Sequence, residues 1–289
     1  MSAPAATAPE GFWRHAAHVL RENPVTLVAF VLFALLVVVA LFGPWLAPYD
    51  PLASNAARAL EPPSAAHWFG TDNLGRDVFS RVLVAARLDL AIAVAAVALA
   101  CVVGAALGAA AGYWGGWIDA AVGRLVDTIM AFPLFVLAMG IVAALGNTIE
   151  NIVYATAIIN LPFYARVVRA EVQIRKDTGF AQAARLAGNT DLQVLALHVF
   201  PNALPALMVQ ISLNMGWAIL NAAGLSFIGL GVRPPTPEWG IMVAEGANFI
   251  VSGEWWLAIF PGLALMLAVF TFNLLGDGLR DIVDPRQRS

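Results

Sequence analysis

The one long polar break in this chain contains Gly179-Phe180-Ala181-Gln182-Ala183-Ala184-Arg185-Leu186-Ala187-Gly188. The break runs from about Arg166 to Asn202 and separates strongly apolar runs. Its alanines would leave a helical surface with little bulk, which a groove of another protein could approach closely. Between apolar runs, such a surface indicates a docking site, although a loop that packs on its own helices would look the same.

Capping signals predict two short helices within this break. Asp177 or Thr178 can cap the start of the first helix, and Gly188 can end it in the left-handed conformation. Thr190-Asp191-Leu192-Gln193 then has the spacing of a capping box, so the second helix is expected to start at once. The two helices would meet at a tight glycine corner.

The composition indicates that most of the chain lies in lipid. Of its 289 residues, 60% are hydrophobic and only 12% are charged, which is too little charge for a soluble domain of this length. The formal net charge of -3 gives no support to nucleic-acid binding. The single cysteine, Cys101, lies in an apolar run and can form no internal disulfide.

Several apolar runs have the length of about 20 residues that a helix needs to cross the hydrocarbon layer. They predict an all-α membrane protein with six transmembrane helices, at Val25–Leu46, Leu88–Gly112, Leu125–Leu145, Asn151–Val168, Ala206–Ile228 and Trp255–Leu275. Pro133, Pro162 and Pro261 fall inside or near the ends of three of these spans. We expect them to kink the helices, which is tolerated in lipid when neighbouring groups satisfy the freed carbonyls.

Two further signals indicate how the spans begin and pack. Asn23-Pro24 gives the first span a side-chain acceptor at its cap and a proline at its first helical position. In the second span, Gly104, Gly108 and Gly112 repeat every four residues. This pattern lets another helix approach closely, so it predicts a helix contact.

The basic residues predict the orientation. With the amino terminus inside, 11 of the 16 Lys and Arg lie on the cytoplasmic side and 5 lie outside. Both termini and the polar break are therefore expected in the cytoplasm. Gly11–Glu22 can form an amphipathic helix along the membrane, and a frayed terminal arm fits this segment equally well.

The predicted arrangement of the spans divides the chain into segments. It predicts a cytoplasmic amphipathic segment at 1–24, the first transmembrane helix at 25–46, an extracytoplasmic segment at 47–87, a five-helix core at 88–276 with a cytoplasmic coupling loop at 169–205, and a cytoplasmic tail at 277–289. A second outer segment, 229–254, contains a proline-rich turn. Such stiff outer segments suit contact with a partner or the shaping of an entrance, and simple rigid linkers would look the same.

Several motifs resemble those of one transporter family. Gln182-Ala183-Ala184-x-x-x-Gly188, followed by Phe200-Pro201, resembles the "EAA" loop of permease subunits in type I ABC importers. Other stretches are similar to the second-subunit (C-type) permeases of dipeptide, oligopeptide and nickel importers: 67–81 (HWFGTDNLGRDVFSR), 112–119 (GYWGGWID), 225–232 (LSFIGLGV) and 273–281 (NLLGDGLRD).

The resemblance implies the type I importer permease fold in a bacterial inner membrane, with this chain forming half of a pathway for di- or oligopeptides. It implies a homologous permease subunit as heterodimer partner, two ATPase subunits and an extracytoplasmic substrate-binding protein. Relatives with these motifs also carry nickel chelates, glutathione and other small solutes, so the substrate stays open.

The resemblance also implies roles for individual residues. It assigns ATPase coupling to Gly179, Phe180, Gln182, Ala183, Ala184, Arg185, Gly188 and Pro201, and an extracytoplasmic motif to Gly70, Thr71, Asp72, Gly75, Arg76 and Asp77. The family usually has Glu where this chain has Gln182. Glutamine keeps a hydrogen-bond acceptor but loses the charge that would form an ion pair with the ATPase.

The chain has no phosphate-binding loop. Such a loop needs a lysine after a glycine-rich turn, and the only lysine, Lys176, is followed by Asp177. We therefore expect no catalysis and no cofactor in this chain, with ATP and Mg bound by partner subunits. The four histidines are scattered along the sequence, so no metal site is expected.

An ion-coupled carrier or a channel is the competing class. Ion-coupled carriers place ionisable groups at membrane depth. The predicted spans hold no Asp, Glu or Lys well inside, because Asp89 and Asp127 lie near span ends, where water can hydrate them. Asp127 could also pair locally with Arg124. The pathway would then be lined by weakly polar groups, which could equally serve helix packing: Asn160, Asn214, Asn221 and Ser226.

Overall fold

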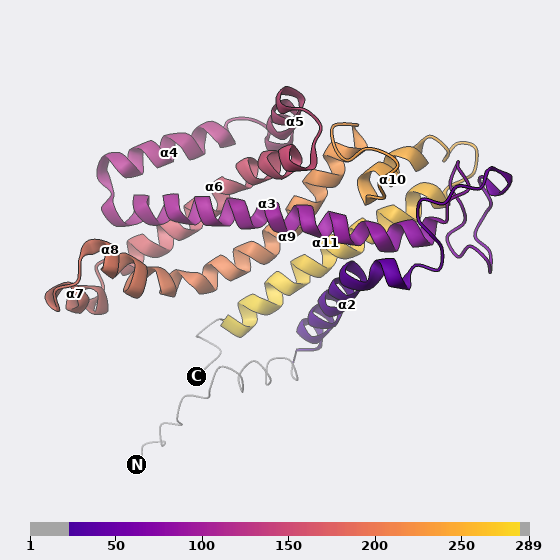
Figure 1. Ribbon diagram of the computed structural model, residues 1–289. Coiled ribbons are helices and arrows are strands. Elements are labelled where there is room, and N and C mark those ends of the chain that lie inside the picture. Colours follow the sequence, from indigo (N-terminus) through magenta and orange to yellow (C-terminus); the bar gives the residue numbers. More distant parts are fainter. Residues whose placement is uncertain (1–22, 284–289) are drawn as a thin grey trace, which may run out of the picture.

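The fold is a bundle of long helices, seen in the computed structural model in Figure 1, which describes residues 23–283. Its helices are α2 (Pro24–Leu46), α3 (Val78–Trp114), α4 (Gly116–Met130), α5 (Leu134–Leu145), α6 (Ile149–Arg175), α7 (Gly179–Leu186), α8 (Asp191–Gln193), α9 (Leu204–Phe227), α10 (Trp239–Ala247) and α11 (Trp256–Val283). Short helical turns lie at Ala56–Arg58, Val194–Val199 and Phe200–Ala203. Within the described part, strand-like pairing is limited to one isolated bridge, Thr71 with Asp77.

Five helices are long and apolar enough to cross a membrane, and the bent pair α4–α5 makes a sixth candidate. The predicted all-α membrane fold is therefore confirmed for the described residues. The amphipathic segment predicted at Gly11–Glu22 lies outside them. Figure 1 shows α7 and α8 at one end of the bundle, and α10 with the segment before α3 toward the other.

α2 begins as the sequence predicts. The Asn23 side chain accepts hydrogen bonds from the amides of Val25 and Thr26, and Pro24 occupies the first turn. The same side chain donates to Asp281 Oδ2 of α11 at 3.1 Å. This hydrogen bond joins the two ends of the described chain at the start of α2.

α3 begins at Val78, not at Leu88 as predicted. Asp77 caps it by accepting a hydrogen bond from the Ser80 amide at 2.8 Å. The start of α3 was not predicted because Arg81 lies in this first part of the helix. A charged side chain argues against a membrane span when its ion-pair partners are unknown. In the fold, Arg81 is buried between acidic side chains.

The predicted glycine contact is confirmed by the packing of α6 on α3. A Cβ atom added at Gly104 would lie 2.7 Å from the carbonyl oxygen of Leu161, and one added at Gly112 would lie 2.7 Å from that of Arg169. Carbonyl groups of α6 therefore occupy the space that larger side chains on α3 would need.

The third predicted span, Leu125–Leu145, is not one helix. It is divided between α4 and α5, which meet at an angle of 89°. Pro133 lies at the break and supplies no amide hydrogen for a continuous helix. The kink predicted at this proline is therefore a complete change of direction.

Two more differences concern the second half of the chain. The helical segment that contains the fifth span runs from Asp191 to Phe227. It therefore begins well before the predicted start at Ala206. The outer segment 229–254 contains α10, which the sequence analysis missed. Its start is fixed by Glu238, whose carboxylate accepts hydrogen bonds from the amides of Gly240 and Ile241.

Candidate functional site

The corner between α7 and α8 has the predicted geometry. α7 ends at Leu186, and Gly188 follows with φ of +88°, in the left-handed region. The Asn189 side chain donates to the Ala184 carbonyl at 2.9 Å and covers the helix end. Thr190 and Gln193 then form the predicted capping box. We name Gly179–Gln193 the coupling corner, after the ATPase coupling that the resemblance predicts for it.

Two of the four alanines of the corner have another role than the one predicted. Ala181 and Ala184 are buried and belong to the same hydrophobic cluster as Val194, Leu195 and Val199. They let α7 pack closely on the turn that follows α8, so they present no surface to a partner. The first arm of the corner is thus packed against the turn that follows the second arm.

The outward surface of the corner consists of other side chains. Leu186 is 90% exposed, the Phe180 ring is half-exposed, and Gln182, Ala183, Ala187 and Gly188 also face outward. Leu186 and the Phe180 ring together give the tip of the corner an exposed apolar surface. Leu186 was not predicted from the sequence, although a leucine directly beside the glycine corner could have indicated it.

Tyr113, at the end of α3, ties the corner to the body of the protein. Its hydroxyl donates to Asp191 Oδ1 at 2.9 Å and accepts from Arg185 Nη2 at 3.3 Å. The Arg185 guanidinium also lies over the Tyr113 ring, 5.5 Å from its centroid. Lys176 Nζ donates to the carbonyl groups of Gly112 and Tyr113. Both arms of the corner are therefore held by one helix end.

The second arm of the corner leads directly into a membrane helix. After α8 the chain forms a π-helical turn at Val194–Val199 and a 3₁₀ turn at Phe200–Ala203, which runs into α9. Pro201 lies in this 3₁₀ turn, where its missing amide hydrogen accounts for the departure from regular helix. A displacement of the corner can thus pass into α9 without crossing a loop.

At the opposite end of the bundle, the six residues that the resemblance assigns to an extracytoplasmic motif come together at the start of α3. Gly70 and Gly75 both have φ of +72° and form tight turns. Arg76 Nε donates to Asp72 Oδ2 at 2.6 Å, and Asp77 Oδ1 lies 2.8 Å from His67 Nδ1. The Thr71 hydroxyl donates to the Arg58 carbonyl.

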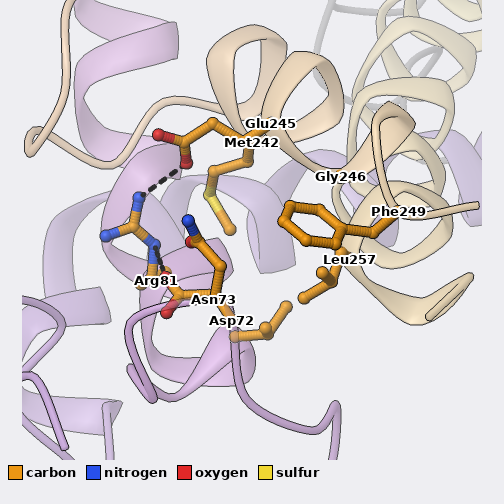
Figure 2. A pocket seen from close by; sticks show the side chains of 9 residues that line it. Asp72, Asn73, Arg81, Met242, Glu245, Gly246, Phe249 and Leu257 are labelled. Carbon is orange, nitrogen blue, oxygen red and sulfur yellow. Dashed lines mark ion pairs between the residues drawn. The ribbon is translucent and has the colours of Figure 1, made fainter. Parts of the chain in front are cut away.

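Figure 2 shows how this cluster joins α10. Arg81 lies between Asp72, at 3.6 Å, and Glu245 of α10, at 3.7 Å. Arg76 also lies 3.8 Å from Glu245. The cavity beside them has a volume of about 20 Å³, which is room for about one water molecule. This cluster therefore ties α3 to α10 and is too small to hold a peptide.

Asp89 is not hydrated, contrary to the prediction. It is 3% exposed, and its Oδ2 accepts a hydrogen bond from the Trp239 amide at 3.1 Å. The carboxyl groups of Asp89 and Glu238 are both buried and lie close to each other. Burial raises the pKa of Glu238, which is 1% exposed.

Asp127 pairs with Arg166 of α6, Nη2 to Oδ1 at 3.0 Å, and not with Arg124, which the sequence offered as a possible local partner. A second pair, Asp119 with Arg169, lies on the same two helices. These pairs join α4 to α6 on the side of the bundle away from α2 (Figure 1). Within residues 23–283, no three His, Cys, Asp or Glu side chains come together as metal ligands would.

Three of the four residues expected to line a pathway are buried between helices. Asn160 Nδ2 donates to the Thr156 carbonyl at 2.7 Å, and Ser226 Oγ accepts from the Val232 amide at 3.1 Å. Asn214 is also buried, whereas Asn221 is partly exposed. Burial of the first three favours the helix-packing role that the sequence left open.

Comparison with known families identifies the fold. The family described as binding-protein-dependent transport system inner membrane component matches residues 104–289. The chain belongs to this family. A second family, the N-terminal transmembrane domain of oligopeptide transport permease C, matches residues 11–63. The chain is thus an integral membrane subunit of a transport system, and the predicted type I permease fold is confirmed.

Individual permeases of this family are similar to the chain over most of its length. The probable D,D-dipeptide transport system permease protein DdpC of Escherichia coli (strain K12) is 43% identical over 267 residues, 92% of this chain and 89% of that protein. The dipeptide transport system permease protein DppC of Alkalihalophilus pseudofirmus is 41% identical over 96% of this chain and 91% of that protein. The glutathione transport system permease protein GsiD of Escherichia coli O157:H7 is 43% identical over 95% of this chain and 89% of that protein.

Proposed function

We propose that this permease forms half of the translocation pathway of an ATP-driven importer in a bacterial inner membrane, and that it carries di- or oligopeptides. The names of its relatives support a peptide substrate, because they refer to dipeptides, D,D-dipeptides and glutathione. A nickel chelate or another small solute is the alternative cargo within the same architecture.

The observation that carries this proposal is the coupling corner. Its first arm packs on the turn that follows its second arm, an exposed leucine lies at its tip, and its second arm continues into α9. Two ATPase subunits would bind ATP and Mg and would hold this corner and its counterpart on a homologous permease subunit. Neither catalysis nor a cofactor is assigned to this chain.

The mechanism follows from the connections of the corner. Closure of the ATPase subunits would draw the two corners together, and α9 would transmit the motion to the outer half of the bundle. ATP binding supplies the difference in free energy between inward-open and outward-open states that alternating access requires. An extracytoplasmic binding protein would deliver the peptide. With the corner and both termini in the cytoplasm, the Arg76–Arg81–Glu245 cluster would lie on the outer side.

The experiment is transport by the purified assembly in proteoliposomes. ATP inside the vesicles should drive uptake of a dipeptide, and the ATPase subunits should co-purify with this chain. Uptake that follows a proton or sodium gradient without nucleotide would contradict the proposal and favour an ion-coupled carrier. Uptake of a nickel chelate in place of the dipeptide would correct the cargo alone.

A further inference from the structure

α2 leaves a hollow between itself and the rest of the bundle. Near one end of α2, a Cβ atom added at Gly43 would meet the carbonyl oxygen of Leu83. Nearer the other end, the ring of Phe33 lies 5.8 Å from that of Phe272 of α11. Between these two contacts lies a cavity of about 420 Å³. We name it the α2 hollow, and it is lined by Leu32, Leu36, Val39, Val82, Ala264 and Leu267, among others.

The walls of the α2 hollow offer too few hydrogen-bonding groups to hold water. Two of the lining side chains are polar, Thr271 and Trp239. The Thr271 hydroxyl donates to the Leu267 carbonyl at 2.7 Å, and Trp239 Nε1 donates to the Val82 carbonyl at 3.0 Å. Since both are satisfied by the backbone, water in the hollow would lack the two to four polar partners that it needs.

The hollow is also too large to stay empty. An apolar protein cavity of about 150 Å³ already takes up small hydrophobic molecules, and this one has about 420 Å³. That volume lies within the range of about 300–1,000 Å³ that is usual for ligand sites. A sizeable hydrocarbon fits both this volume and the apolar walls.

The position of the opening identifies the source of this hydrocarbon. Leu35 of α2 and Leu263 and Leu267 of α11 line the hollow, yet each is about half exposed. The opening thus lies on the outer surface of two membrane-spanning helices, where the surrounding solvent is the bilayer core.

One end of the hollow lies beside two exposed tryptophans. Phe79 lines it and lies 4.8 Å from the exposed indole of Trp68, and Phe260 lines it and lies 5.8 Å from the exposed indole of Trp255. Exposed tryptophans gather at the membrane–water interface. A chain that fills the hollow would therefore end near these indoles.

We propose that the α2 hollow binds one acyl chain of a bilayer phospholipid, with its headgroup beside Trp68 and Trp255. The bound chain would complete the packing between α2 and the bundle. This lipid site does not depend on the solute that the transporter carries.

Photolabelling of the assembled transporter tests this site. The probe is phosphatidylethanolamine with a diazirine in the middle of one acyl chain, incorporated into the proteoliposomes. Adducts should be enriched on residues 32–39 and 263–267 relative to the exposed face of α3 around Val102, which is in ordinary contact with lipid. No enrichment over Val102 in the wild-type protein would overturn the proposal.

A matched pair of variants on α11 provides a second measurement of lipid binding. Ala264→Trp fills the hollow, so these adducts should disappear and the purified transporter should retain one phospholipid fewer per chain. Met266→Trp, on the exposed face of the same helix, should change neither. Unchanged adducts in Ala264→Trp would contradict the lipid site. Crosslinking of Leu36→Cys to a second protein subunit would also contradict it, because that subunit would then fill the hollow.

Discussion

The Tyr113 hydroxyl donates a hydrogen bond to Asp191 Oδ1 at 2.9 Å, which links the end of α3 to the first residue of α8. The same hydroxyl accepts from Arg185 of α7. The Tyr113 side chain therefore connects both arms of the coupling corner to α3, the longest of the helices that pack on α6. In the proposed mechanism, this link lets the corner move with the bundle as one unit.

Tyr113→Phe should weaken coupling without preventing assembly. Each lost hydrogen bond to a charged group costs about 1.5–3 kcal/mol, so the corner would be held less firmly while its outward surface stays intact. We expect ATP hydrolysis by the assembly to continue and the uptake per ATP hydrolysed to fall. Tyr154→Phe, on the exposed face of α6, is the control and should keep the wild-type ratio.

Leu186→Ser should weaken binding of the ATPase subunits. Burying a leucine side chain at an interface contributes about 1.5–3 kcal/mol, and Leu186 contributes little to this chain's own core because it is 90% exposed. The measurement is the amount of ATPase that co-purifies with the permease. Val251→Ser removes an equally exposed apolar residue near the other end of the bundle and should have no effect. Equal losses in both variants would argue against docking at Leu186.

Gly108→Val should destabilise the bundle itself. The added side chain would collide with the Ala165 backbone of α6, and overpacking of this kind costs about 1–3 kcal/mol or more. The thermal midpoint of the detergent-solubilised protein should fall. Gly140→Val on α5 meets no atom within 4 Å and should leave the midpoint near the wild-type value.

Glu238→Gln should flatten the dependence of stability on pH. Burial raises the pKa of Glu238 in the folded protein, so its contribution to stability is present below the unfolded pKa and is lost as pH rises through the folded pKa. The neutral glutamine does not undergo this loss. As pH rises above the ordinary glutamate pKa of 4.5, thermal midpoints should therefore decline in the wild type and change less in the variant. A parallel decline in Glu238→Gln would contradict the assignment.

The sequence predicted features that depend on neighbouring residues. The cap at Asn23, the left-handed Gly188 and the capping box at Thr190 each rest on interactions within a few positions, which composition and spacing reveal. The glycine contact of α3 was predictable for a related reason, since a four-residue repeat places small residues on one face of a helix.

Features that depend on distant partners escaped the sequence analysis. Asp89 could be taken as hydrated because its partner amide, that of Trp239, lies 150 positions away. The start of α3 was missed because the acidic partners of Arg81 come from the preceding turn and from α10. The inward direction of Ala184 depends on how α7 packs against Val194–Val199, which spacing alone does not fix.

The central claim is that the corner at Gly188 is the element through which ATPase subunits drive transport. A Cβ atom added at Gly188 would meet no atom within 4 Å, and φ of Gly188 is +88°, so within this chain a substitution there acts through backbone strain. Valine is strongly disfavoured in this conformation, whereas asparagine tolerates it.

The most direct measurement is ATP-driven uptake by the reconstituted assembly that carries Gly188→Val, with Gly188→Asn as the matched control. We expect Gly188→Val to insert into the membrane but to lose uptake while ATP hydrolysis persists, and Gly188→Asn to transport nearly as the wild type does. Wild-type uptake by a correctly inserted Gly188→Val permease would contradict the account.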